Sequence, residues 1–115
     1  MMRLKEQRQK ERHNAYKLDE DAVLSVRVIE ARDLRPVGIT ASCDPYVVLK
    51  FGDNQQTQKT KYKKNELSPV WNEVFTFDVQ TGTEVLEVSV YDKDDFSTRD
   101  EFEGWFEVAL DHLKD

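Results

Sequence analysis

The sequence contains one cysteine, Cys43, so it excludes an internal disulfide and a zinc site built from several cysteines. Its longest apolar run, Tyr46–Leu49, is far too short to cross a bilayer. Residues 1–17 are charged from the third position onward and lack the apolar stretch of a secretory signal. These absences favour a reducing, intracellular compartment, and we expect a cytoplasmic protein.

The residue arrangements that support catalysis are also missing. His13 and His112 belong to no nucleophile arrangement, and the sequence has no glycine-rich phosphate loop. Asp92 and Asp94 are close enough in sequence to form an acid and base pair. However, a solvated loop is a poor place to raise the pKa of a carboxyl group. We therefore expect a protein that is not an enzyme.

Charge divides the chain into two parts. The net charge is −6, yet residues 1–17 carry a balance of +4, so the rest carries −10. The overall acidic balance argues against nucleic-acid binding, which needs a basic face. Residues 1–21 have only scattered weak hydrophobes, and we expect a charged leader there, helical or disordered. The length leaves room for one domain, which we expect over residues 22–115.

From Ala22 onward, apolar and polar residues alternate with the period of two that is typical of β-strands. Leu24, Val26 and Val28, for example, share one face, while Ser25 and Arg27 point away. The pattern predicts six strands, at residues 23–29, 45–51, 58–64, 75–79, 86–90 and 105–110. No long segment has the helical period of 3.6. The sequence therefore predicts an all-β fold, an antiparallel β-sandwich.

The densest acidic cluster, residues 92–101, directly follows the predicted strand that ends at Tyr91. We expect it to form a loop at one tip of the sandwich. Calcium prefers six to eight oxygen ligands in flexible geometry, and this loop can supply several. A solvated acidic loop without metal is the alternative. An EF-hand is disfavoured because Phe96 and Ser97 stand where an oxygen ligand and glycine are required.

Four motifs together resemble the C2 domain, the conserved region 2 of protein kinase C. They are LSVRVIEARDL at residues 24–34, SCDPYV at 42–47, LSPVWNEVFTF at 67–77, and VYDKD with the following segment at 90–104. The resemblance covers residues 22–115 and implies a C2-type sandwich of eight strands. With six strands counted, we expect a sandwich that lacks one or two of the eight and is truncated at its carboxyl-terminal end.

The resemblance implies a calcium site between two loops. Asp44, Asp92, Asp94 and Asp100 match four of the family's five aspartate ligands, and Ser97 matches an occasional hydroxyl ligand. The fifth aspartate is replaced by Gly38, and the loss of ligand charge predicts weak calcium binding.

The same resemblance implies lipid contacts. Lys59 and Lys61 match lysines that bind phosphoinositide headgroups in conventional protein kinase C, and Tyr46 and Tyr91 match the aromatic positions. Val48 replaces a further lysine of that site. An alternative is that these strand lysines only prevent edge-to-edge aggregation.

Ile39 and Phe96, one in each loop, are candidates for insertion into a membrane, and local packing is their alternative role. Trp71 and Trp105 are expected to anchor the core or the loops.

The resemblance therefore predicts a peripheral membrane-targeting module that binds acidic phospholipids, such as phosphatidylserine, through calcium. The alternative is a calcium-independent C2 domain with a degenerate calcium site, which binds phosphoinositides or a protein. We expect an anionic membrane as the partner. A protein partner and a strand-exchanged homodimer are further possibilities, because unpaired strand edges can bind another chain.

Overall fold

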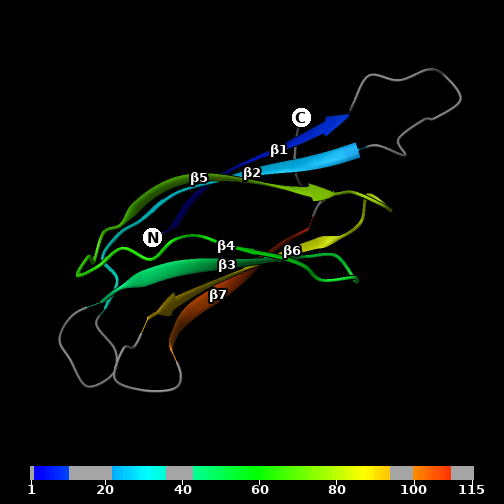
Figure 1. Ribbon diagram of the computed structural model, residues 1–115. Coiled ribbons are helices and arrows are strands. Elements are labelled where there is room, and N and C mark those ends of the chain that lie inside the picture. The colour runs from blue at the N-terminus through cyan, green and yellow to red at the C-terminus, as the bar shows by residue number, and fades with distance from the viewer. Residues whose placement is uncertain (1, 11–21, 36–42, 94–99, 110–115) are drawn as a thin grey trace, which may run out of the picture.

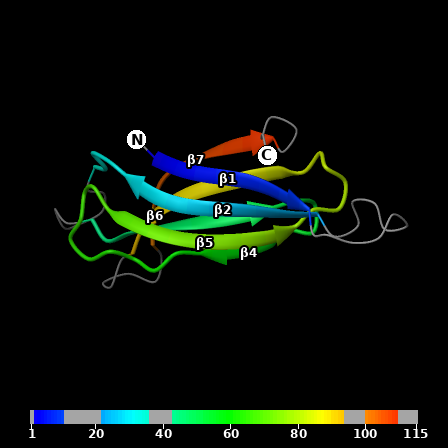
Figure 2. The same ribbon diagram turned by 90° about the horizontal axis from the view of Figure 1, so that it is seen from above.

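The computed structural model of the protein describes residues 2–10, 22–35, 43–93 and 100–109. They form two antiparallel sheets that lie face to face (Figures 1 and 2). The first sheet has the order β1-β2-β5 and the second the order β4-β3-β6-β7. The strands are β1 (Met2–Lys10), β2 (Ala22–Ala31), β3 (Pro45–Phe51), β4 (Gln56–Lys59), β5 (Val70–Asp78), β6 (Val85–Asp92) and β7 (Glu101–Ala109). The prediction of an antiparallel β-sandwich is confirmed.

The core lies between the two sheets and is built from alternate residues of the central strands. Leu24, Val26 and Val28 of β2 are fully buried, as the sequence predicts. The facing sheet contributes fully buried aliphatic and aromatic side chains, namely Val47, Leu49, Phe51, Leu86 and Val88. Each such side chain stabilises the fold by about 1.5 to 3 kcal/mol relative to an exposed one.

The amino-terminal segment differs from the expectation of a helical or disordered leader. Residues Met2–Lys10 form strand β1, which pairs with β2 from Met2 opposite Ala31 to Lys10 opposite Ala22. Met2 and Leu4 are partly buried against the core, and Arg3 forms an ion pair of 2.7 Å with Glu30. A strand at a sheet edge needs few apolar residues, because backbone hydrogen bonds to its single neighbour supply most of the pairing. Residues 11–21 lie outside the described part of the chain.

Strand β4 is shorter than predicted, because it ends at Lys59 rather than continuing to Lys64. The hydroxyl of Thr60, which is buried, accepts a hydrogen bond of 2.9 Å from the Val47 N–H. The next residue turns toward the other sheet, where the Lys61 N–H donates to the carboxylate of Glu73 at 3.1 Å. Lys59 and Lys61 therefore do not alternate on one strand.

The side chain of Gln56 joins the two sheets at one edge of the sandwich. Its amide donates to the carbonyl of Asp78 and accepts from the N–H of Asp78, both at 2.9 Å. The primary amide has both a donor and an acceptor, so it pairs with β5 as a neighbouring backbone would. This pairing connects β4 of one sheet to β5 of the other.

Replacement of Gln56 by alanine removes both hydrogen bonds. We expect Gln56→Ala to lower the free energy of unfolding by about 1 to 2 kcal/mol, measured by urea denaturation. Gln58→Ala is the matched control, because Gln58 is an exposed residue of the same strand. The control should change the free energy by less than about 0.5 kcal/mol. Equal effects of the two substitutions would show that the amide pairing does not connect the sheets.

Candidate functional site

Strand pairing brings three of the predicted calcium ligands to one end of the sandwich. Asp92, the last residue of β6, stands opposite Pro45 of β3 and opposite Glu101 of β7. Asp44 directly precedes β3, and Asp100 directly precedes β7, so both lie at the end where β6 finishes (Figure 1). The remaining predicted metal-site positions, Gly38, Asp94 and Ser97, lie outside the described residues.

Asp44 and Asp92 are in direct contact. The Asp44 N–H donates to Asp92 Oδ1 at 2.8 Å, and the Asn65 N–H donates to Asp44 Oδ1 at 2.8 Å. The Asp44 carbonyl in turn accepts from the Lys93 N–H at 3.0 Å. Asp92 is only 5% exposed, so its carboxylate is held at the strand end by a backbone donor as well as being a candidate ligand.

The donor types at this end fit calcium better than a softer metal. Within the described residues, Cys43, Asp92 and Glu103 offer ligand atoms that all lie within 4.8 Å of one another. The thiol of this group is a poor calcium ligand, and it donates to Glu103 Oε1 at 3.5 Å. The carboxylates of Asp44 and Asp92 supply the hard oxygens that calcium prefers.

Asp100 contacts β3 through its carboxylate. The hydroxyl of Tyr46 donates to Asp100 Oδ2 at 2.6 Å. The Tyr46 ring stacks on Tyr91 with a centroid separation of 5.7 Å, and Tyr91 contacts the edge of Phe102. Burial, followed by the hydrogen bond to Asp100 and its negative charge, raises the pKa of Tyr46 above its ordinary value of 10.0. Tyr46 is therefore a neutral hydrogen-bond donor at physiological pH.

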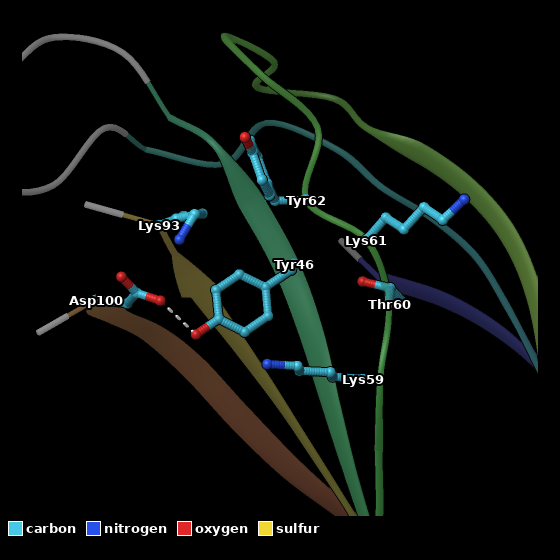
Figure 3. Close-up of a pocket in the computed structure, with 7 residues that line it drawn as sticks. All are labelled: Tyr46, Lys59, Thr60, Lys61, Tyr62, Lys93 and Asp100. Carbon is cyan, nitrogen blue, oxygen red and sulfur yellow. Dashed lines mark hydrogen bonds between the residues drawn. The ribbon is translucent and has the colours of Figure 1, made fainter. Parts of the chain in front are cut away.

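A pocket of about 620 Å³ lies beside the Tyr46 ring, and Figure 3 shows its lining. Lys59 and Lys93 extend toward the ring, whereas Lys61 points away from it. The full lining, called the lysine pocket below, consists of Tyr46, Lys59, Thr60, Lys61, Tyr62, Lys93 and Asp100. Positive side chains around an aromatic wall suit an anionic ligand.

The structure brings together three of the four predicted lipid contacts. Tyr46, Lys59 and Lys61 line the lysine pocket, while Tyr91 supports the Tyr46 ring instead of lining it.

Sequence reasoning missed two lining residues, Lys93 and Tyr62. The Lys93 Nζ lies 5.5 Å from the centroid of the Tyr62 ring. Lys93 directly follows the last residue of β6. Its place at the end of that strand is the signal that could have distinguished it from the rest of the acidic cluster, residues 92–101.

The predicted membrane-inserting residues, Ile39 and Phe96, lie outside the described part of the chain. The two tryptophans differ from each other. Trp71 is buried in the core as expected, whereas Trp105 of β7 is 56% exposed and does not anchor the core.

The described part of the chain contains no helix long and apolar enough to span a membrane.

A family model described as "C2 domain" matches residues 22–115. FT-interacting protein 1 of Arabidopsis thaliana is 45% identical over 84 residues, which are 70% of this chain and 10% of that protein. The chain therefore spans about a tenth of that relative's length.

Solved structures agree with the family match. The first C2 domain of plant Extended Synaptotagmin 1 has a TM-score of 0.72 and 35% identity, covering 78% of this chain and 70% of that one. The calcium-bound pair of C2 domains of Extended-Synaptotagmin 2 has a TM-score of 0.66 and 32% identity, covering 76% of this chain and 34% of that one.

Cys43 is predicted to be unreactive in the folded protein. Burial, together with the charge of Asp92 and the hydrogen bond to Glu103, raises the pKa of its thiol from 9.0 to about 12. The raised pKa reduces the thiolate fraction near pH 8, so Ellman's reagent should react at least about 100-fold more slowly than with unfolded protein. The rates are compared in chelator, with and without guanidinium. Equal rates in the two conditions would contradict the burial of the thiol.

Proposed function

The chain belongs to the C2 domain family, and we propose that it targets the protein that carries it to acidic phospholipid membranes through calcium. The convergence of Asp44, Asp92 and Asp100 at one end of the sandwich, beside the lysine pocket, is the main observation in favour. The module acts without catalysis, at the cytoplasmic face of the membrane.

Calcium is held by the carboxylates of Asp44, Asp92, Asp94 and Asp100, with the hydroxyl of Ser97 as a further ligand. Bound calcium supplies the positive charge that attracts anionic headgroups to a cluster that otherwise repels them. Because Gly38 lacks the carboxylate expected at its position, the site has low affinity. The structural likeness to a relative solved with calcium bound supports this proposal.

The lysine pocket contributes contacts that do not depend on the metal. Lys59 and Lys61 bind phosphate groups of the headgroups, and Tyr46, supported by Tyr91, forms the wall. Each lysine near an anionic surface contributes about 1 kcal/mol. Ile39 and Phe96 insert into the bilayer interface, where each buried side chain contributes about 1.5 to 3 kcal/mol.

A calcium-independent C2 domain, which binds phosphoinositides or a protein, is the second candidate function. One observation favours it: an oxygen of Asp92 already accepts from the Asp44 N–H, so this carboxylate has a structural role without metal. The lining of the lysine pocket contains one predicted calcium ligand, Asp100, and its other residues are not candidate ligands. The two functions differ in whether membrane binding requires calcium.

Asp44→Asn tests the calcium-dependent function. The asparagine keeps an oxygen that accepts from the Asn65 N–H, so the fold is retained while one ligand charge is lost. We expect the calcium concentration for half-maximal binding to phosphatidylserine vesicles to rise at least about tenfold. Co-sedimentation over a calcium series at physiological salt gives this value.

The matched control is Asp53→Asn, which makes the same charge change in the exposed turn between β3 and β4, at the opposite end of the sandwich. It should leave the calcium requirement unchanged. Wild-type sedimentation that is equal in calcium and in chelator would rule out the first function and leave the calcium-independent alternative.

A further inference from the structure

The outer face of the first sheet carries positive charge on a chain whose net charge is −6. Arg27 lies on β2, the central strand of that sheet, and is exposed while Val26 and Val28 beside it are buried in the core. Lys5 of β1, also exposed, stands directly opposite Arg27 in the strand register. Figure 2 is seen from this side, with β1, β2 and β5 in front of the second sheet. Two like charges therefore lie side by side on one face.

A hollow of about 80 Å³ lies at these two side chains, and its lining consists of Lys5, Ser25, Arg27 and Val74. Val74 of β5 stands opposite Arg27 on the other side of β2. Ser25 precedes Arg27 by two residues, so the two lie on the same face of the strand. The hollow is far smaller than the roughly 300 to 1,000 Å³ of pockets that enclose a whole ligand. It therefore suits one small group of a larger molecule.

Neither Lys5 nor Arg27 has an ion-pair partner among the described residues. Glu30, the one acidic residue of β2, pairs with Arg3 at 2.7 Å and with Arg32 at 3.6 Å. Like charges directly opposite each other on neighbouring strands destabilise a sheet. Protection against aggregation explains a lysine on an edge strand such as β1, but not an arginine on the central strand. The pair of charges therefore points to an external anion.

The chemistry of the lining suits a phosphate monoester better than a carboxylate. Arg27 offers a guanidinium fork, Lys5 an ammonium group and Ser25 a hydroxyl, and all three donate hydrogen bonds. A phosphate monoester carries a charge of about −1.5 to −2 at neutral pH and three acceptor oxygens. It can thus balance both cations, whereas a carboxylate brings a single charge. Val74, which is 48% exposed, offers an apolar contact to the chain that carries the phosphate.

The position of the hollow indicates which kind of molecule presents the phosphate. Tyr46 alternates with the buried Val47, so it lies on the outer face of the second sheet. The lysine pocket beside Tyr46 and the hollow at Arg27 are therefore on opposite outer faces of the sandwich (Figures 1 and 2). A bilayer that contacts the lysine pocket leaves the hollow facing away from it. A protein in solution is then the source that can reach the hollow.

We propose that Lys5, Ser25 and Arg27 bind a phosphorylated side chain of a partner protein. The second sheet and the acidic end contact the membrane, and the first sheet holds a phosphorylated protein on the side away from it. Only this orientation rests on the proposed function, because the site itself requires neither calcium nor lipid.

The first test titrates the wild-type chain in chelator with a short uncharged peptide that carries one phosphoserine, and follows amide NMR shifts. We expect the largest shifts around Ser25 and Arg27. The same peptide with glutamate in place of phosphoserine should bind at least about tenfold more weakly, because it loses charge and a charge-assisted hydrogen bond. Equal binding of the two peptides would overturn the proposal. Inorganic phosphate should bind more weakly than the phosphopeptide, and equally tight binding would overturn the assignment to a protein partner.

Substitutions of Arg27 test its role in recognition. Arg27→Gln should weaken binding of the phosphopeptide at least about tenfold. The matched control is Arg35→Gln, which makes the same charge change at an exposed arginine beyond the end of β2 and should leave binding unchanged. Arg27→Lys keeps the charge but loses the bidentate fork, so its effect should lie between the two. Equal effects of Arg27→Gln and Arg35→Gln would show that net charge alone attracts the peptide.

Thermal unfolding distinguishes a binding role of Arg27 from a structural one. Without peptide, Arg27→Gln should melt at a higher temperature than the wild-type chain, because the repulsion from Lys5 is removed. The phosphopeptide should raise the melting temperature of the wild-type chain but not that of the variant. A variant that melts at a lower temperature than the wild-type chain would assign Arg27 to the fold and contradict the proposal.

Vesicle binding separates this inference from the proposed function. Arg27→Gln should leave the calcium concentration for half-maximal binding to phosphatidylserine vesicles unchanged, since the hollow faces away from the bilayer. Weaker vesicle binding by this variant would identify a lipid as the ligand of the hollow and overturn the protein partner. A wild-type chain that binds the phosphopeptide but no vesicles, with or without calcium, would refute the proposed function and leave the phosphate site in place.

Discussion

The position of β6 between β3 and β7 is the constraint on which the acidic end depends. Asp92 stands opposite Pro45 on one side and Glu101 on the other, so the residues just outside those two strands converge beside it. The register is held by the core, because a shift of one residue turns every buried side chain of a strand toward solvent. The buried Val47 and Val88, which are not candidate ligands, therefore help to determine where Asp44 and Asp100 lie.

The end of the sandwich combines an acidic cluster with a basic pocket, and Tyr46 stands between them. Its ring is one wall of the lysine pocket, while its hydroxyl contacts Asp100. Charges of opposite sign thus meet at this end of the sandwich, because Asp100 lines the same pocket as the lysines. Such an arrangement keeps both sites responsive, because a change of charge in one alters the potential in the other.

The sequence predicted the central strands because alternation records burial on one face, and β2, β3 and β6 each bury one face in the core. It did not predict β1, since an edge strand with one neighbour needs only a few apolar contacts, here Met2 and Leu4. The convergence of Asp44 with Asp92 follows from strand order. The hydrogen bond from Tyr46 to Asp100 does not, because it depends on the rotamers of two side chains, which no spacing encodes.

The hydrogen bond from the Asp44 N–H to Asp92 has a consequence for how the family's acidic motif is inherited. An aspartate that closes the end of a strand is retained by selection for folding even in a lineage that has lost its metal. Asp92 is therefore a poor marker of calcium binding among descendants of this domain. Asp100 accepts a hydrogen bond from the Tyr46 side chain, and its loss would leave the contact between Asp44 and Asp92 in place, so its retention is the more informative trace of a working site.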